Sequence, residues 1–277
     1  MRINSFVTPE SLREEIVTLS PAESHHLARV LRVEPGQELT LFDGQGTRAS
    51  GIVDSVTKKK VTVRVTGRET VPPPAVEVTL IQAVCKPDRF EMILQKATEL
   101  GVRHIIPVVT ANASLPAGKI DKMIARGEAI IRNAAQQCGT AWLPNFQPLE
   151  PTALGLADFF QGLEKKSGSL RGRYSPGLAA EQRLEASATF PNVGNFDAVF
   201  VGSLHAGARP FREVFQGLEK SQIKRAAILI GPEGDFTEEE VNAAVDAGAV
   251  PVTFGKQILR TETAAIFGLS VLAYELC

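Results

Sequence analysis

The sequence predicts an α/β protein in which a small all-β unit precedes a mostly parallel sheet flanked by helices. Up to about residue 70, short alternating apolar segments are separated by turn residues, which is typical of antiparallel strands. From Val76 onward, apolar runs alternate with helical patterns, which indicates a parallel sheet. Three consecutive prolines, Pro72 to Pro74, lie between the two patterns and cannot donate to a sheet ladder. We therefore predict a β domain over residues 1–70, a linker over 71–75 and an α/β domain over 76–277.

The β domain is expected to contain a hairpin and one helix. Residues 38–43 and 47–56 flank Gly44-Gln45-Gly46, as the arms of a hairpin flank its turn. A helix is predicted from Ser20 to Leu31, because its first residue can cap the helix and Glu23 can complete a capping box.

The α/β domain is expected to alternate strands with helices. We predict Asp88 as the cap of its first helix and a capping box beginning at Thr237. Residues 145–195 are rich in Gly, Ser and Pro, so loops with one or two short helices are expected there. The predicted strands cover residues 76–84, 105–109, 197–201, 226–230 and 250–254, and the predicted helices cover 88–101, 119–138, 209–218, 237–248 and the chain after 260.

Composition excludes several classes of protein. The net charge is −1 with a pI near 6.5, so general coating of nucleic acid is not expected and any RNA binding should be local. Three widely spaced cysteines and four histidines without zinc-type spacing predict reduced thiols and no metal site. Because the sequence shows neither a membrane-length apolar run nor a signal-peptide pattern, we expect a cytoplasmic protein without a membrane segment.

Two short motifs near the C-terminus are the most informative residues of the chain. Gly231-Pro232-Glu233-Gly234-Asp235-Phe236 follows one predicted strand, and Ile258 to Ala264 follows another and opens the last helix. Open α/β sheets bind their ligands at the carboxyl ends of strands, so the two motifs predict a ligand site. A simpler interpretation remains for each motif alone: a tight turn for the first, and a surface ion pair with a helix cap for the second.

The two motifs together resemble the RsmE family of ribosomal RNA uridine N3-methyltransferases, which belong to the knotted methyltransferases called SPOUT. Further matches follow in the order of the family along almost the whole chain. They are His25-His26-Leu27 with Val30-Leu31-Arg32, Lys96-x-x-Glu99-Leu100-Gly101-Val102, and Ala134-Ala135-Gln136-Gln137.

The resemblance implies a SPOUT-type trefoil-knotted, mostly parallel sheet preceded by a small PUA-like β-barrel that binds RNA. It also implies a homodimer that uses S-adenosylmethionine to methylate N3 of a uridine in the 16S RNA of the small ribosomal subunit. The residues expected to bind the cofactor are Gly202, Leu204, His205, Ile230, Gly231, Pro232, Glu233, Gly234, Phe254, Gly255, Ile258, Leu259, Arg260, Thr261 and Thr263.

The proposed reaction requires the uracil N3 to lose its proton before it can attack a methyl group. Arg260 suits stabilisation of the resulting anion, and Glu233 and Glu262 are candidates for the base, which the sequence does not rank. Contacts with RNA are expected from His26, Arg29, Arg32, Lys58, Lys59, Lys60, Arg64, Lys86 and Arg89. On composition alone, the lysine cluster would more often be a solvated turn.

Two segments depart from the family pattern at positions expected to face RNA. Residues 110–114 lack the usual basic residue, and residues 132–140 differ from the usual Glu-Ala-Ala-Glu-Gln-Ser-x-Arg. Two alternatives therefore stay open: a SPOUT enzyme that methylates another base or a ribose, and a non-catalytic RNA-binding or ribosome assembly factor. The intact Arg260-Thr261-Glu262 speaks against the second.

Overall fold

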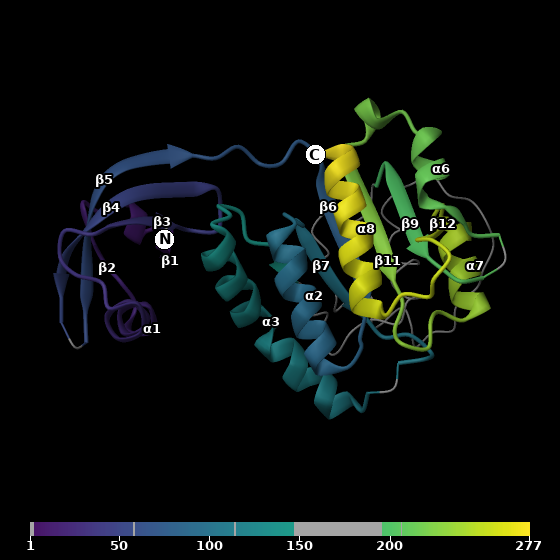
Figure 1. Ribbon diagram of the computed structural model, residues 1–277, viewed down its shortest axis with the longest axis horizontal. Coiled ribbons are helices and arrows are strands. Elements are labelled where there is room, and N and C mark those ends of the chain that lie inside the picture. The colour runs from purple at the N-terminus through teal and green to yellow at the C-terminus, as the bar shows by residue number, and fades with distance from the viewer. Residues whose placement is uncertain (1–2, 58, 114, 147–195, 206) are drawn as a thin grey trace, which may run out of the picture. The chain divides into compact units, whose positions relative to one another are not determined.

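The computed structural model describes residues 3–57, 59–113, 115–146, 196–205 and 207–277, and the chain forms two compact units (Figure 1). The first comprises Met1–Pro74 together with Ala129–Leu143, and the second comprises Ala75–Glu128 and Pro144–Cys277. Lys58 and residues 147–195 lie outside the described residues. The segment 145–195 was expected to form loops and short helices, but its first two residues form a short strand that pairs with another strand of the second unit.

The first unit is built on a five-stranded sheet with the order β1-β3-β4-β5-β2. The predicted hairpin is confirmed, with β3 and β4 as its arms. β1 pairs with β3 in parallel and the other pairings are antiparallel. Two register shifts between β4 and β5 act as bulges, which bend and curl a sheet. The strands are β1 (Asn4–Phe6), β2 (Ile16–Thr18), β3 (Glu38–Phe42), β4 (Thr47–Val56) and β5 (Val61–Thr70), with a 3₁₀ turn at Ser11–Arg13.

The predicted helix of this unit forms in two parts. α1 (Pro21–His25) is capped by Ser20, as expected, and continues as a π-helical turn over His26–Leu31. The predicted capping box was wrong in one respect, because the Glu23 side chain does not bond back to the backbone of Ser20. Its carboxylate instead accepts hydrogen bonds from Ser5 Oγ at 2.5 Å and Gln136 Nε2 at 2.6 Å. Two neighbouring side-chain donors therefore engage the carboxylate that was expected to bond its own helix.

Residues 129–143 complete the first unit by packing against its strands. Asn4 Nδ2 donates to the carbonyl of Gln136 at 2.8 Å, and the indole Nε1 of Trp142 donates to the carbonyls of Val71 and Pro72 at 3.1 Å each. The backbone of Gly46 approaches the Trp142 ring so closely that a Cβ atom there would overlap it. The end of helix α3 (Ala117–Cys138) and the residues after it are thus part of this unit's fold.

The second unit contains a seven-stranded sheet with the order β10-β12-β9-β11-β6-β7-β8, and each described pairing in it is parallel, as predicted. Its buried strands are rich in Ile, Val, Leu and Ala because both faces of such a sheet are covered. The strands are β6 (Glu77–Ala83), β7 (His104–Val108), β8 (Asn145–Phe146), β9 (Ala198–Gly202), β10 (Arg209–Pro210), β11 (Arg225–Ile230) and β12 (Val250–Thr253).

The helices of this unit pack against the sheet, and α2 (Pro87–Glu99) and α8 (Thr261–Leu276) lie side by side (Figure 1). Asp88 was wrongly expected to cap α2: the helix begins at Pro87, which suits the first position, so Asp88 lies inside its first turn. The capping box of α7 (Glu238–Asp246) is confirmed. α6 (Phe211–Gln216) is shorter than expected. A proline disfavours helical backbone at the residue before it, so Arg209 does not begin the helix, and Arg209–Pro210 forms the short strand β10 instead. None of the described helices is long and apolar enough to cross a membrane.

The contact between Gly46 and Trp142 generates a test of how residues 129–143 stabilise the first unit. We expect Gly46→Ala to lower the free energy of unfolding by about 2–4 kcal/mol, because overpacking costs about 1–3 kcal/mol and a left-handed backbone costs a residue with a side chain about 1–2 kcal/mol. Urea unfolding followed by the fluorescence of Trp142, the chain's one tryptophan, measures this change. Gly36→Ala is the matched control, since Gly36 also has a positive φ but open space around it. Equal losses in the two variants would contradict a stabilising contact with Trp142.

Candidate functional site

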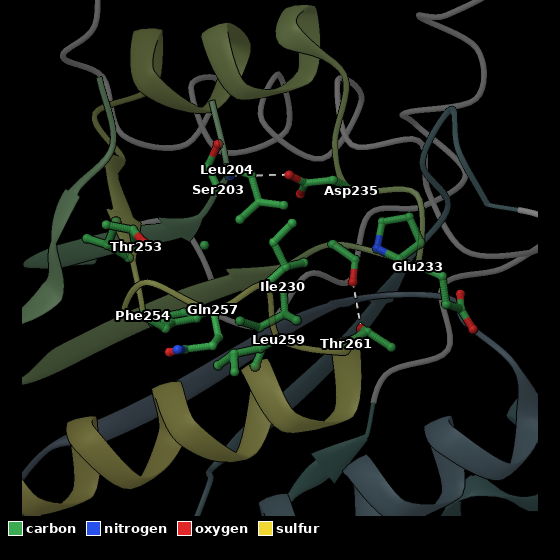
Figure 2. A pocket seen from close by; sticks show the side chains of 16 residues that line it. Ser203, Leu204, Ile230, Glu233, Asp235, Thr253, Phe254, Gln257, Leu259 and Thr261 are labelled. Carbon is green, nitrogen blue, oxygen red and sulfur yellow. Dashed lines mark hydrogen bonds between the residues drawn. The ribbon is translucent and has the colours of Figure 1, made fainter. Parts of the chain in front are cut away.

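A pocket lies where the carboxyl ends of β9, β11 and β12 meet the first turn of α8 (Figure 2). Because β9 pairs with both β11 and β12, the loops after these three strands are adjacent although they are far apart in the sequence. Ten residues that the sequence assigned to a cofactor site line it: Gly202, Leu204, Ile230, Gly231, Pro232, Glu233, Phe254, Ile258, Leu259 and Thr261. The other lining residues are Ser203, Asp235, Val252, Thr253, Gln257 and Ala264, which the sequence analysis missed.

The turn after β11 is held by the carboxylate of Asp235. Asp235 has a φ of +58°, a left-handed conformation that residues other than glycine rarely adopt. Its Oδ1 accepts from Phe236 N at 2.8 Å, and its Oδ2 accepts from Leu204 N at 3.2 Å. The second bond joins the turn after β11 to the loop after β9, and both loops line the pocket (Figure 2). Asp235 belongs to the first of the two C-terminal motifs. Its position in a predicted tight turn could have identified it as a residue that holds the turn in place.

Thr261 anchors the same turn to α8. Its buried hydroxyl donates to the carbonyl of Gly231 at 2.6 Å (Figure 2). The same hydroxyl accepts from Gln82 Nε2 at 3.3 Å. Thr261 does not cap the helix, because the N-cap residue is Arg260, whose side chain makes no capping bond. The two motifs singled out in the sequence are therefore joined by a direct hydrogen bond.

Both candidate carboxylates lie beside Arg89, which extends from α2. Arg89 Nη1 is 3.1 Å from Glu233 Oε1, and Arg89 Nε is 3.8 Å from Glu262 Oε2. Lys86 N also donates to Glu233 Oε1 at 3.3 Å. In Figure 2 the Glu233 side chain points away from the other lining side chains. The expected RNA contact of Arg89 would therefore compete with two carboxylates.

A buried thiol adjoins these carboxylates. Burial, followed by the negative charges of Glu233 and Glu262, raises the pKa of Cys85 well above its usual range, so this thiol stays protonated. Cys85 is therefore a packing residue at neutral pH rather than a nucleophile.

Arg260 is the cation of the second motif, and it is exposed at the edge of the site. Its side chain makes no hydrogen bond or ion pair with any residue that the structure describes. It is not among the pocket-lining residues, and the same holds for Glu262, His205, Gly234, Gly255 and Thr263. His205 instead contacts the carbonyl of Phe236 through Nε2 at 2.9 Å. An unpaired guanidinium remains free to approach an anionic group.

The residues expected to contact RNA fall into both units. His26, Arg29, Arg32, Lys59, Lys60 and Arg64 are exposed on the first unit, whereas Lys86 and Arg89 belong to the second. Arg64 pairs with Asp54 at 2.5 Å, and Lys58 lies outside the described residues. Arg32 has a φ of +53° directly after the π-helical turn, an unusual backbone that is often found at functional sites.

The two altered segments make contacts within their own units. In residues 110–114, Asn112 Nδ2 donates to the carbonyls of Gly234 and Asp235 at 3.0 Å each. In residues 132–140, Gln136 bonds Glu23, and the Arg132 guanidinium lies 4.6 Å from the centre of the Phe6 ring. No sequence signal could have found these contacts, because they depend on which segments become neighbours in the fold. The described residues contain no cluster of side chains that could hold a metal ion.

The buried hydroxyl of Thr261 allows a matched test of the link between the two motifs. We expect Thr261→Val to lower the free energy of unfolding by about 1–3 kcal/mol, because the variant keeps the shape but leaves buried polar groups unpaired. Thr263→Val, at an exposed position of the same helix, should change it by at most about 0.5 kcal/mol. Thermal and urea unfolding of both variants measure the difference, and similar losses would mean that the hydroxyl bond contributes little.

Comparisons with known proteins agree with this architecture. The RNA methyltransferase domain family matches residues 72–166 and 179–273, and the RNA methyltransferase PUA domain family matches residues 19–66. Ribosomal RNA small subunit methyltransferase E of Mycobacterium bovis is 31% identical over 252 residues, which cover 90% of this chain and 83% of that protein.

Two solved structures resemble the whole chain, each over 99% of it and 98% of its own length. One is a putative methyltransferase from Legionella pneumophila in complex with its bound cofactor SAM, with a TM-score of 0.77 and 28% identity. The other is ribosomal RNA small subunit methyltransferase E from Neisseria gonorrhoeae bound to S-adenosyl methionine, with a TM-score of 0.75 and 25% identity. Taken with the strand-end pocket and the two joined motifs, these matches show that the chain belongs to the RsmE family of ribosomal RNA small subunit methyltransferases.

Proposed function

We propose that this protein transfers a methyl group from S-adenosylmethionine to N3 of a uridine in the 16S RNA of the small ribosomal subunit. The observation that supports this most is the pocket at the ends of β9, β11 and β12, built from both motifs in a chain of the RsmE family. Methylation of another RNA base or of a ribose, and a non-catalytic role in ribosome assembly, are less well supported, because the pocket residues and Arg260 are all present.

The lining residues suit the chemistry of S-adenosylmethionine. Leu204 and Ile258 are 58% and 78% exposed although both are apolar, and the flat face of an adenine ring would cover them. Gly202 has no room for a side chain, since an added Cβ would lie 2.9 Å from the Phe254 ring. The Phe254 ring therefore packs directly against the backbone at the end of β9, and both residues line the pocket. We propose that the lining residues hold the cofactor, and that His205, Gly234, Gly255, Arg260 and Thr263 shape the loops around it.

When bound, S-adenosylmethionine supplies a methyl group that is already activated by its positively charged sulfur. The protein must then favour removal of the N3 proton of uracil and hold the base in line. Arg260 suits stabilisation of the uracil anion because its guanidinium has no partner among the described residues. Glu233 and Glu262 are less suited to act as the base, because the Arg89 guanidinium lies 3.1 Å from the first carboxylate and 3.8 Å from the second and so engages both.

RNA binding is proposed for the exposed basic residues of the first unit. The π-helical turn presents His26 and Arg29, and the left-handed Arg32 follows it. Val30, between them in sequence, is 62% exposed and offers an apolar surface to an unstacked base. Lys59 and Lys60 are exposed in the turn between β4 and β5, where they are available to phosphates.

We also propose a cytoplasmic homodimer with a trefoil knot around the pocket. Three exposed apolar side chains support the dimer: Met92 on α2, and Phe267 and Tyr274 on α8, at 46%, 42% and 88% exposure. Sedimentation equilibrium tests the dimer, and a monomer at micromolar concentration would contradict it.

The knot is proposed from the order of the strands. In the sheet, β9 lies between β11 and β12, and the chain after β12 returns as α8 to pack on β11 and β6. A crystal structure that traces the loops from β9 to α8 tests the knot.

The methyl-transfer reaction itself can be tested with one variant and two controls. Small ribosomal subunits that lack the modification, and naked RNA in parallel, should gain labelled methyl from S-adenosylmethionine as N3-methyluridine. We expect Arg260→Ala to reduce the rate about 10²- to 10³-fold, a typical loss for a removed anion stabiliser, while cofactor affinity stays within a few-fold. Arg260→Lys should keep part of the activity, and Arg212→Ala on α6 should keep all of it. Equal loss of rate and cofactor affinity would make Arg260 structural, and label in another nucleoside would overturn the N3 specificity.

The lysine turn can be tested through the salt dependence of RNA binding. Changing Lys58, Lys59 and Lys60 together to glutamine should weaken binding and flatten the plot of log affinity against log salt by roughly 0.7–0.9 per lost phosphate contact. The control changes three exposed lysines of the second unit to glutamine in the same way: Lys119, Lys122 and Lys224. An unchanged slope in the first variant would leave these residues as a solvated turn.

A further inference from the structure

The loop after β7 is bonded to the pocket-lining turn after β11 through one side chain, that of Asn112. Its Nδ2 lies 3.0 Å from the carbonyl oxygens of both Gly234 and Asp235. The contact is tight, because a Cβ atom added at Gly234 would lie 3.0 Å from the Cβ of Asn112. A second bond, from Ala111 N to Glu240 Oε1 at 2.8 Å, fixes the same loop to the beginning of α7. β7 and β11 both neighbour β6, so this loop crosses the end of β6 to reach the turn.

The turn that Asn112 contacts is one whose backbone needs support. Asp235 adopts a left-handed φ, which costs a residue with a side chain about 1–2 kcal/mol. Its carboxylate accepts from the N–H groups of Phe236 and Leu204 and has no hydrogen to donate to the carbonyls of the turn. The amide of Asn112 has two N–H donors, one for each of the carbonyls at 234 and 235.

These bonds form a continuous connection from the β7 loop to the wall of the pocket. Asn112 holds the carbonyls of Gly234 and Asp235, and Asp235 in turn holds Leu204 N in the loop after β9. Both Leu204 and Asp235 line the pocket, whereas Asn112 does not. A change at Asn112 would therefore reach the pocket through the position of the turn.

We propose that Asn112 is a positioning residue for the methyl-donor pocket, although residues 110–114 correspond in sequence to positions expected to face RNA. The proposal rests on the proposed function, because it assumes that the pocket binds S-adenosylmethionine. It assigns to Asn112 an effect on cofactor affinity rather than on affinity for RNA.

Three substitutions at this position separate the two roles. Asn112→Asp replaces the donor by a carboxylate that repels both carbonyls, Asn112→Ala removes the donor, and Asn112→Gln keeps an amide. Asn242→Ala is the matched control, because Asn242 is exposed on α7 and its side chain makes no hydrogen bond with the described residues. Thermal unfolding of each variant shows that it is folded before binding is measured.

Calorimetry of S-adenosylmethionine binding without RNA is the first readout, and the KM values for cofactor and RNA in methyl transfer are the second. We expect Asn112→Asp to weaken cofactor binding about tenfold and Asn112→Ala about two- to fivefold, since hydrogen bonds at this exposed site each change an equilibrium constant by only a few-fold. Asn112→Gln should recover part of the affinity, and the KM for RNA should stay within twofold in all variants.

Hydrogen exchange of the cofactor-free protein gives a readout that does not depend on activity. Peptides covering residues 202–205 and 231–236 should exchange faster in Asn112→Ala and Asn112→Asp than in the wild type, and Asn242→Ala should not differ. Unchanged cofactor affinity with a raised KM for RNA would overturn the proposal and make Asn112 an RNA contact. Failure of the wild-type protein itself to bind S-adenosylmethionine would overturn the proposed function, and that result is distinct from a difference between variants.

Discussion

The parallel pairing of β9 with both β11 and β12 is the constraint on which the site depends. Parallel neighbours end at the same edge of a sheet, so three loops that are distant in sequence meet there. Hydrogen bonds then fix each loop to the next: Asp235 joins the turn after β11 to the loop after β9, and Thr261 joins it to the first turn of α8. The pocket is therefore formed by three strand-end loops that a few buried or half-buried polar side chains hold in place.

Charge at the edge of the pocket is unevenly distributed. Arg89 lies between Glu233 and Glu262, so one cation is shared by two carboxylates, and both Arg89 and Glu262 are largely shielded from water. Arg260, close in sequence to Glu262, has no such partner among the described residues. Shared ion pairs of this kind hold loops in position, whereas an unpaired guanidinium is available to a ligand. The structure thus distinguishes Arg260, an exposed cation without a partner among the described residues, from the two carboxylates that share Arg89.

Local patterns predicted the hairpin, the longer strands and the helices to within a few residues because these depend on neighbouring residues. The cap of α7 followed from Thr237 and Glu240 in this way. The two-residue strands β8 and β10 were not predicted. Predictions were wrong where a distant segment supplied the partner: Glu23 bonds Ser5 and Gln136 instead of its own helix. Asn112 was missed for the same reason, since nothing in its own segment indicates that the turn after β11 lies beside it. The two C-terminal motifs could be found because each lies at a strand end and contains residues typical of a binding turn.

The order of segments in the chain has a consequence for how the protein is made. The first unit needs residues 129–143, which are synthesised only after residues 75–128 of the second unit. Until then, Glu23 lacks Gln136, and the surface around Gly46 lacks the Trp142 ring that covers it. Domains generally fold as units during synthesis, beginning from the N-terminus. Here the N-terminal unit can complete its fold only when the nascent chain extends past Leu143, so residues 75–128 of the second unit are synthesised before the first unit is complete.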